Sequence, residues 1–382
     1  MRPRERVALA LEHREPDRVP IDLGGSVSSM HSLAYERLVK HLGLKPEVKI
    51  ADKIQQLARL DEALLKTLEV DFRHFSLKKG FFIGGEDRFD DPSGRPYFID
   101  DWGIKWGKSP YYYDMIYHPL QNLGTDDLDD YAWPDPRDPT RYEGLGEEVK
   151  NVYQTTDYAL VADAIFGGIF ECAWWLRGFE KFAVDMYKRP DFAEALLDKV
   201  LELYMGFYSR YMDEVGDYVQ MVELGDDVGA QTGPMISPRL LRKYFKPRWK
   251  KLYDLIHSKT KAKIFHHSCG SIYPFIGDLI DVGVDVLNPI QPLAANMDIG
   301  NIKKEFGDKL SLHGGVDIQR VLPLGTPNDV VAEVKRVIRL AAQNGGYILA
   351  GAHNIQPDTP IENIQSMFEA GRKFGAYPLR LQ

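Results

Sequence analysis

The chain has 382 residues, of which 44% are hydrophobic and 27% charged, a composition typical of a globular protein with a large core. Its formal net charge of −8, without clustered cations, argues against nucleic-acid binding, and no apolar run is long enough to span a membrane. Cys172 and Cys269 are too few for a disulfide framework, so we expect a reduced, cytoplasmic protein. The charged first twenty residues are unlike a secretory signal and predict a short helix.

Short β-rich runs alternate with longer helical patterns along most of the chain. Periodic apolar residues predict helices, most clearly at 191–216, 238–259 and 327–346. This alternation predicts parallel strands joined by crossover helices. Because there are so many strand-helix units, we expect residues 1–382 to form a single α/β domain, a (β/α)8 (TIM) barrel. A doubly wound open sheet is the alternative. The predicted strands lie, in chain order, at 19–25, 70–77, 158–165, 218–224, 262–268, 284–290, 310–316 and 346–352.

The stretch from about 78 to 155 differs, because aliphatic residues are scarce and aromatic residues alternate. The turn residues at 91–94, Asp-Pro-Ser-Gly, predict a β-hairpin, and the Pro- and Asp-rich segment 128–144 predicts an extended loop. We expect an insertion that covers one face of the barrel. Its aromatic side chains could wall an aromatic substrate or form the core of the hairpin: Trp102, Trp106 and Tyr111 to Tyr113.

Polar side chains stand at the end of nearly every predicted strand from residue 155 onward. Because the carboxyl ends of barrel strands share one mouth, we expect these side chains to line one site. Helix caps and terminal hydrogen bonds would explain one or two of them, but explain the whole set poorly. The set is Asp163, Glu223, Asp226, Asp227, His267, Cys269, Asn288, Gln291, His313, Asp317, His353 and Asn354.

His267 and Cys269 give the sharpest signal, because residues two apart in an extended segment point the same way. Imidazole nitrogen and thiolate sulfur both bind Zn²⁺, and a catalytic zinc site needs three protein ligands and one open position. His353 is the predicted third ligand. The structural alternative is a buried cysteine beside a hydrogen-bonded histidine. His266 points the opposite way and is expected to pack behind the barrel.

The other strand-end residues are assigned roles by their chemistry. Glu223 is predicted to be a fourth ligand, or a carboxylate that orients a ligand or handles a proton. Asp226 or Asp227 is expected to reach over the mouth, while the other caps a helix or turn. His313 either contacts substrate or closes a hydrogen bond. The remaining members are expected to contact substrate: Asp163, Asn288, Gln291, Asp317 and Asn354.

These motifs resemble the uroporphyrinogen decarboxylase superfamily, and more closely its corrinoid-dependent methyltransferase branch. The resemblance implies a (β/α)8 barrel with its site at the carboxyl-end mouth. It covers most of the chain, through "RERVALALEHREPDRVPIDLGG", "VELGDDVGAQTGPMISPRLLRKYFKPRWKKL", "IFHHSCGSIYPFIGDLIDVGVDVLNPIQ", "LSLHGGVDIQRVLPLGTPNDV" and "LAGAHNIQPDTPIENIQSMFEA".

In the methyltransferase branch, a His-x-Cys pair and a later Cys bind zinc. His267 and Cys269 match the pair, and His353 stands where the later Cys would fall. Either His353 replaces that thiolate or the metal site is altered or lost; imidazole is an ordinary zinc ligand, which favours retention. In the decarboxylases a catalytic histidine also falls near this position. Their Arg-rich N-terminal stretch has no counterpart in "DRVPIDLGGSVSSMHS", and an acidic mouth does not suit eight substrate carboxylates.

The resemblance therefore implies a zinc-dependent methyltransferase that moves a methyl group between a small substrate and the cobalt of a corrinoid protein. The substrate is a methyl ether, aromatic or not, or a thiol. Loss of one thiolate makes the zinc more electrophilic, which favours demethylation of an ether. Cobalamin is expected on a partner protein, since the chain shows no motif or module of its own for it. A metal-free decarboxylase and a non-catalytic small-molecule binding protein are the alternatives.

Overall fold

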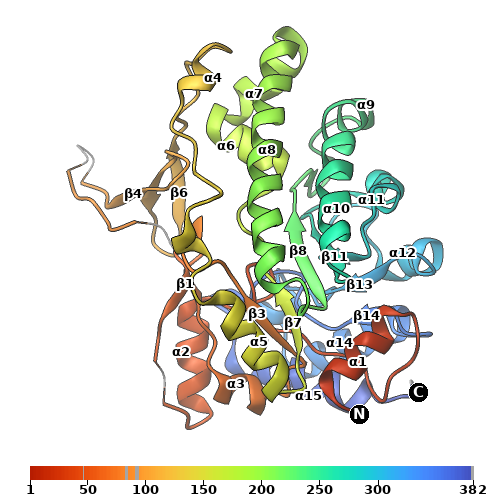
Figure 1. The fold of residues 1–382 in the computed structure, drawn as a ribbon. Helices are drawn as coiled ribbons and strands as arrows, with labels where there is room; N and C mark the ends of the chain where they lie inside the picture. Colours follow the sequence, from red (N-terminus) through yellow and green to blue (C-terminus); the bar gives the residue numbers. More distant parts are fainter. Residues whose placement is uncertain (46, 82–84, 91–93, 380–382) are drawn as a thin grey trace.

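The computed structural model describes residues 1–45, 47–81, 85–90 and 94–379 (Figure 1). Its main sheet has seven parallel strands in the order β14-β13-β12-β11-β8-β7-β3. Six of these strands lie inside predicted ones, and β8 extends one residue beyond its predicted range of 218–224. Their bounds are β3 Phe72–Phe75, β7 Ala159–Ala162, β8 Met221–Gly225, β11 Lys263–His267, β12 Val286–Asn288, β13 Ser311–His313 and β14 Tyr347–Ile348.

The segment around Ile21 closes this sheet into a barrel. Ile21 forms a parallel bridge with Leu349, and the N–H of Asp22 donates to the Leu349 carbonyl at 2.9 Å. On its other side, the N–H of Asp71 donates to the Ile21 carbonyl at 2.9 Å, directly before β3. All eight predicted strand segments therefore contribute to the wall. The predicted (β/α)8 barrel is confirmed, and the open-sheet alternative is wrong.

Helices surround the barrel because their apolar stripes pack on the outward-facing strand residues. The predicted helices at 191–216 and 327–346 are α8 (Pro190–Val215) and α14 (Pro327–Ala341). The predicted helix at 238–259 is divided by a π-helical turn, η3, next to Pro247, which has no N–H to donate. The other helices are α1 Pro3–Leu11, α2 Ser32–His41, α3 Glu62–Thr67, α4 Asp127–Asp130, η2 Pro139–Arg141, α5 Leu145–Thr155, α6 Ile169–Arg177, α7 Phe179–Lys188, α9 Pro238–Leu240, η3 Leu241–Phe245, α10 Lys246–Lys259, η4 Tyr273–Phe275, α11 Ile276–Val282, α12 Ile299–Phe306, α13 Val321–Leu324 and α15 Ile361–Phe374.

Side chains inside the barrel form an apolar layer below a polar one. The apolar layer is packed by α1 from below through Val7 and Leu11, and it contains Phe72, Ala159, Val161, Met221, Phe265, Val286 and Ile348. Because side chains alternate along a strand, the residue two positions later faces the interior again. At that level polar residues stand instead: His74, Asp163, Glu223, His267 and Asn288. The fold therefore gathers its polar groups toward the carboxyl ends of the strands.

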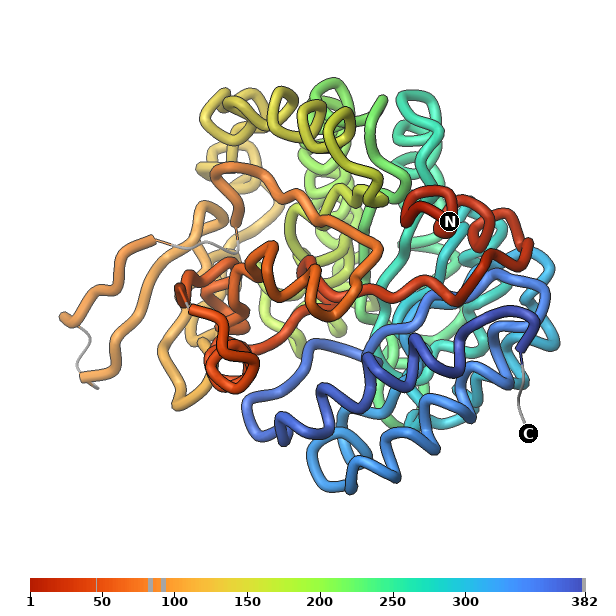
Figure 2. Tube along the Cα trace, turned by 90° about the horizontal axis from the view of Figure 1, so that it is seen from below, coloured from red at the N-terminus to blue at the C-terminus, as the bar shows by residue number. Residues whose placement is uncertain are grey.

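The predicted insertion contains an antiparallel sheet of β4 (Tyr97–Ile99), β5 (Lys105–Lys108) and β6 (Tyr113–Tyr117). In Figures 1 and 2 this sheet lies at the left-hand side of the barrel, and the N–H of Tyr113 donates to the Ile54 carbonyl at 2.9 Å. The predicted hairpin turn at 91–93 lies outside the described residues. Trp102 and Trp106 are buried where this segment packs on Phe166 and on Trp175 of α6, whereas Tyr111 is 52% exposed. The last helix of the stretch, α5, is the crossover from β3 to β7.

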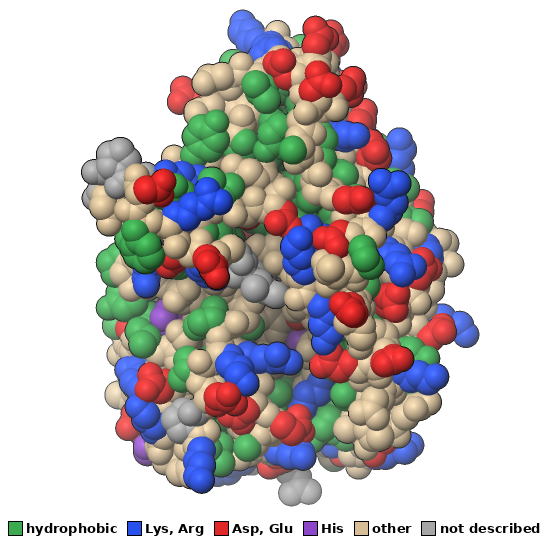
Figure 3. All heavy atoms as spheres, turned by 60° about the vertical axis from the view of Figure 1, so that its left-hand side comes forward, with side chains coloured by type: hydrophobic (Ala, Val, Ile, Leu, Met, Phe, Trp, Pro, Cys, Tyr) green, Lys and Arg blue, Asp and Glu red, His purple; other side chains and the backbone are tan. Residues whose placement is uncertain are grey.

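Two short pairs of strands lie outside these layers. The pair β1 (Ile50–Asp52) and β2 (Leu57–Ala58) is antiparallel, as is the pair β9 (Gly229–Ala230) and β10 (Gly233–Pro234). On the face shown in Figure 3, acidic and basic side chains are interspersed. Among the described residues, no helix is both long enough and apolar enough for a membrane span.

Candidate metal centre

His267, Cys269 and His353 come together from two distant parts of the chain, and we call them the His-Cys cluster. One potential ligand atom of each lies within 4.8 Å of the others. The Cys269 Sγ atom is 3.4 Å from His267 Nε2, and the rings of His267 and His353 are 5.5 Å apart between centroids. Gly270 follows with φ +80°, and a Cβ there would lie 2.5 Å from the Gly229 backbone. A glycine is therefore required where the chain turns away from the cluster.

Burial keeps the ligand atoms of Cys269 and His353 uncharged in the metal-free protein. Burial raises the pKa of the Cys269 thiol well above its ordinary value, and the Asp227 carboxylate adds to the rise. Burial lowers the pKa of His353 to about 4, with a smaller contribution from His267. At neutral pH the metal-free cluster thus presents a thiol and a neutral imidazole. Because a bound cation favours the thiolate, this set of nitrogen and sulfur donors fits zinc.

His267 is held by a chain of hydrogen bonds that crosses the barrel interior. Its Nδ1 atom is 2.5 Å from Asn288 Oδ1, and Asn288 Nδ2 is 2.8 Å from His313 Nδ1. His313 Nε2 in turn lies 2.9 Å from Asp22 Oδ2. Since a carboxylate only accepts, His313 donates to Asp22 and accepts from Asn288, so the amide oxygen accepts the Nδ1 proton of His267. This tautomer leaves His267 Nε2 free to face Cys269.

His313 and Asn288 are therefore interior groups. His313 is fully buried, and both of its ring nitrogens are hydrogen-bonded, one to Asn288 and one to Asp22. Of its two predicted roles, the structure therefore shows the hydrogen bond. Behind the barrel wall, the Nδ1 atom of His266 lies 2.7 Å from the Tyr253 hydroxyl, and burial lowers the pKa of His266 to about 3.

Asp226 and Asp227 are adjacent but do different things. Asp226 accepts hydrogen bonds from the N–H groups of Phe170 and Glu171, at 2.9 and 3.0 Å, and so caps the N-terminus of α6. Asp227 Oδ1 accepts from the Cys269 N–H at 2.7 Å and lies 3.6 Å from His267 Nε2. Of the two predicted roles, the cap belongs to Asp226 and the place beside the His-Cys cluster to Asp227.

Glu223 and Asp163 belong to a second group, with His74, which we call the carboxylate cluster. One potential ligand atom of each lies within 4.8 Å of the others. His74 Nδ1 is 2.8 Å from Asp163 Oδ1, and its Nε2 is 3.0 Å from Asp22 Oδ1. Burial alone would lower the pKa of His74, but these two carboxylates outweigh it and raise that pKa well above its ordinary value. Burial and Asp163 raise the pKa of Glu223 to about 8.

Three further predicted residues hold loops. Gln291 Oε1 accepts from the Gly270 N–H at 2.7 Å. Asp317 Oδ1 accepts from two N–H groups of the turn that follows it. Asn354 ties the loop at Ser26 to the barrel, because its Nδ2 donates to the Ser26 carbonyl at 2.8 Å. The structure gives these three side chains positioning contacts, and their substrate contacts stay predictions.

Two residues of this interior, Asp22 and His74, are absent from the predicted site. Both lie in predicted strands. His74 stands two residues after buried Phe72, the same spacing that separates Val161 from Asp163. That spacing is the signal that identifies a polar residue of the upper layer.

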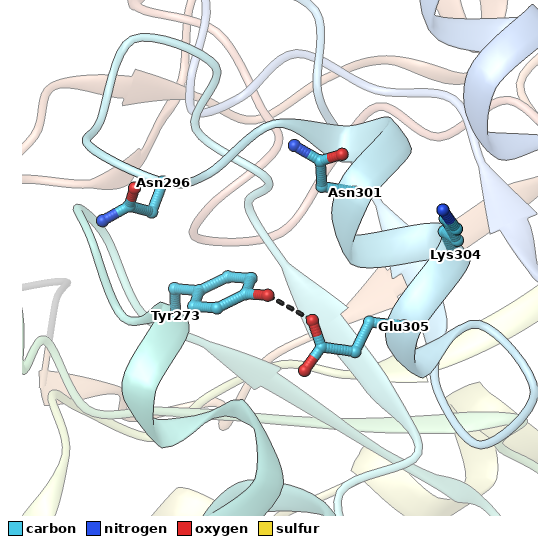
Figure 4. A pocket seen from close by; sticks show the side chains of 5 residues that line it. All are labelled: Tyr273, Asn296, Asn301, Lys304 and Glu305. Atoms are coloured by element: carbon cyan, nitrogen blue, oxygen red, sulfur yellow. Dashed lines mark hydrogen bonds between the residues drawn. The ribbon is translucent and has the colours of Figure 1, made fainter.

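A surface pocket of about 520 Å³, lined by none of the residues of the two clusters, lies between η4 and α12 (Figure 4). In it the Tyr273 hydroxyl donates to the Glu305 carboxylate. None of its described lining residues belongs to the predicted site: Tyr273, Asn296, Asn301, Lys304 and Glu305.

The closed barrel, with its polar groups at the carboxyl ends of the strands, defines a (β/α)8 protein with a site at the usual end of that fold. Residues 118–374 match the model of the uroporphyrinogen decarboxylase (URO-D) family, and the chain belongs to that family. This confirms the resemblance inferred from the motifs.

Relatives of two kinds are found. The chain is 25% identical over 190 residues to a uroporphyrinogen decarboxylase of Pelodictyon phaeoclathratiforme, covering 48% of this chain and 50% of that protein. It is 27% identical over 206 residues to the methylcobamide:CoM methyltransferase MtaA of Methanosarcina barkeri, covering 53% and 54%. The chain thus spans about half the length of these curated relatives.

A solved structure supports the fold over the whole chain. A methyltransferase from Methanosarcina mazei superposes with a TM-score of 0.66 at 20% identity, covering 98% of this chain and 100% of that one. At this identity the likeness supports the barrel fold alone.

Proposed function

We propose that this protein is a zinc-dependent methyltransferase that moves a methyl group between a small substrate and the cobalt of a corrinoid protein. The observation that carries the proposal is the convergence of His267, Cys269 and His353, with ligand atoms within 4.8 Å of one another. The likeness to a methylcobamide:CoM methyltransferase supports the methyltransferase part of this proposal.

The His-Cys cluster would hold the zinc. When bound, the metal supplies Lewis acidity to the oxygen or sulfur atom of the substrate. Asn288 fixes the His267 tautomer, so Nε2 keeps the lone pair that ligation needs. Asp227, which already binds the Cys269 N–H, is placed to hold a proton beside the ligands.

The charge of the interior favours methyl transfer over porphyrinogen decarboxylation. Asp22, Asp163 and Glu223 are buried in the polar layer, and Asp227 lies beside the His-Cys cluster. A substrate with eight carboxylates needs cationic partners there, whereas a neutral ether or thiol does not. We therefore rank decarboxylation second, although a relative carries that name.

The proposed substrate is a methyl ether, because the ligand set contains one sulfur. A zinc ion with two neutral imidazoles and a single thiolate is a stronger electrophile than one with two thiolates, and suits activation of a leaving oxygen. Thiol methylation is the other direction of the same chemistry. Cobalamin would be supplied by a separate corrinoid protein docked over the strand ends.

Metal analysis of protein purified without oxygen tests the proposal. We expect about one zinc per chain in the wild type at this site, and its loss in the His267→Ala, Cys269→Ala and His353→Ala variants. With reduced cobalamin and a panel of aryl and alkyl methyl ethers, methyl transfer appears as conversion of the Co(I) absorption spectrum to that of methyl-cobalt. The three variants should lose this conversion together with the metal.

Cys172→Ala is the matched control, since Cys172 is the other cysteine and is buried in α6. It should keep both zinc and activity. A metal-free protein that decarboxylates a porphyrinogen would contradict the proposal and support the second function. Protein with neither zinc nor turnover would indicate a binding protein.

A further inference from the structure

The carboxylate cluster is built from three neighbouring strands. His74 lies on β3, Asp163 follows β7 and Glu223 lies on β8, and these strands are adjacent in the sheet. All three side chains are almost completely buried, with Glu223 at 0% exposure. Their facing atoms are His74 Nδ1, Asp163 Oδ1 and Glu223 Oε2.

The atoms of His74 and Asp163 that face away from this point are fixed by other groups. His74 Nε2 donates to Asp22 Oδ1 at 3.0 Å, and the Ser76 hydroxyl donates to Asp163 Oδ2 at 2.6 Å. Metal-binding histidines in proteins typically donate their second ring N–H to a carboxylate in this manner. The hydrogen bonds therefore orient one nitrogen and one oxygen toward the same point.

Glu223 supplies the observation that points to a ligand. Its Oε1 accepts from the Ser26 hydroxyl, but its buried Oε2 has no hydrogen-bond partner among the described residues. An unpaired buried carboxyl oxygen is costly, and native proteins rarely leave one. A Cβ placed on Gly25 would lie 2.6 Å from His74 Nδ1, 2.9 Å from Asp163 Oδ1 and 3.1 Å from Glu223 Oε2. Only a residue without a side chain leaves the space in front of these atoms open.

We propose that the carboxylate cluster is a second cation site, in which His74 Nδ1, Asp163 Oδ1 and Glu223 Oε2 bind a divalent metal. The bound cation would replace the proton that His74 now shares with Asp163 and would give Glu223 Oε2 its missing partner. The site is separate from the His-Cys cluster, and it stands whether or not the proposed function is correct.

The donor set selects the kind of metal. Two carboxylate oxygens and one imidazole nitrogen, without sulfur, suit Mn²⁺ or Fe²⁺, whereas the thiolate of the His-Cys cluster favours Zn²⁺. Three buried carboxylates, counting Asp22, surround a single imidazole here, so a divalent charge is compensated locally. We therefore expect the chain to bind two different cations, with Mn²⁺ at the carboxylate cluster.

Titration of the full-length, chelator-treated protein with MnCl₂ tests this site, with free Mn²⁺ followed by its electron paramagnetic resonance signal. The wild type should take up Mn²⁺ at one site per chain. Glu223→Gln and Asp163→Asn keep the side-chain shapes but remove a charged ligand, so each should lower the affinity for Mn²⁺ by more than about 100-fold. Loss of a group that only orients a ligand costs less than this. Asp52→Asn, at a buried carboxylate outside the cluster, should bind Mn²⁺ like the wild type.

The two metal sites are distinguished by the Cys269→Ala variant. It should lose zinc and still bind Mn²⁺. The Mn²⁺ titration therefore tests the carboxylate cluster even if the proposed methyl transfer is not found. The inference is overturned if chelator-treated wild type binds no Mn²⁺. It is also overturned if Glu223→Gln and Asp163→Asn, folded by circular dichroism, bind Mn²⁺ with wild-type affinity.

Discussion

The Nδ1 atom of His267 lies 2.5 Å from the Oδ1 atom of Asn288, and both side chains are buried at the ends of adjacent strands. This contact decides which nitrogen of His267 is available to a metal. Asn288 can serve as acceptor because its own amide hydrogen goes to His313. A residue predicted to contact substrate thus acts on a candidate ligand instead.

Replacement of Asn288 by leucine should weaken zinc binding by about 10- to 100-fold, because His267 loses the acceptor that fixes its tautomer. The measurement is zinc competition with a chelating dye at constant pH. Asn288→Asp keeps an acceptor for His267 and should lose less affinity. Equal zinc affinity in Asn288→Leu and wild type would contradict this role for the hydrogen bond.

Much of the barrel could be predicted from the sequence, because its strands repeat a simple pattern. Phe72 and His74, Met221 and Glu223, and Phe265 and His267 are each pairs in which an apolar residue precedes a polar one by two positions. Alternation along a strand brings all members of one kind to one level of the barrel. The pattern therefore predicts which residues share the polar layer.

The pairing of polar groups within that layer could not be predicted in the same way. Asp226 and Asp227 are identical in type and adjacent in sequence, yet one caps α6 and the other contacts Cys269. The difference depends on where α6 begins in space, which no local pattern records. Likewise, Glu223 joins His74 instead of the His-Cys cluster, because β8 lies between β7 and β11 and the choice depends on side-chain direction.

The contact between Asp226 and α6 leaves no room at Gly168, where a Cβ would lie 2.1 Å from Asp226 Cγ and 2.2 Å from the Gly225 carbonyl. Gly168→Ala should therefore reduce the free energy of unfolding by about 3 kcal/mol through overpacking. Gly277→Ala is the opposite case, since this exposed position in α11 has nothing within 4 Å of an added Cβ. It should stabilise by about 0.5–1 kcal/mol. Urea denaturation measures both, and equal effects would refute the steric argument.

Because Lys303 is largely buried, we expect the folded protein to become more stable as the pH rises into the alkaline range. Burial lowers its pKa in the folded protein to about 8 from the ordinary 10.5. Below pH 8 the amine is charged in both states and its burial costs free energy; between the two pKa values only the unfolded chain keeps the proton, so stability increases with pH. The advantage of Lys303→Met over the wild type should fall by about 3 kcal/mol between these pH values. Lys304→Met, at the exposed neighbouring position, should show no such trend in denaturation curves.

Asp22 connects the two clusters, because its Oδ2 accepts from His313 at 2.9 Å and its Oδ1 from His74 at 3.0 Å. Burial would raise the pKa of this carboxyl, but the two histidines outweigh it and hold that pKa well below its ordinary value. Asp22→Asn removes the charge opposite His74, and we expect it to lower the free energy of unfolding by about 3–5 kcal/mol.

The same substitution should reduce affinity for zinc and for manganese together, by about 10-fold or more each, because it disturbs the orientation of His267 and of His74. Asn288→Leu breaks only the hydrogen bonds that lead from Asp22 to His267, and should therefore lower the affinity for zinc alone. Parallel titrations of the two variants with each metal separate these effects. If Asp22→Asn weakened the binding of only one metal, Asp22 would not orient the histidine at the site of the other metal. That result would contradict the role of this carboxylate in orienting both histidines.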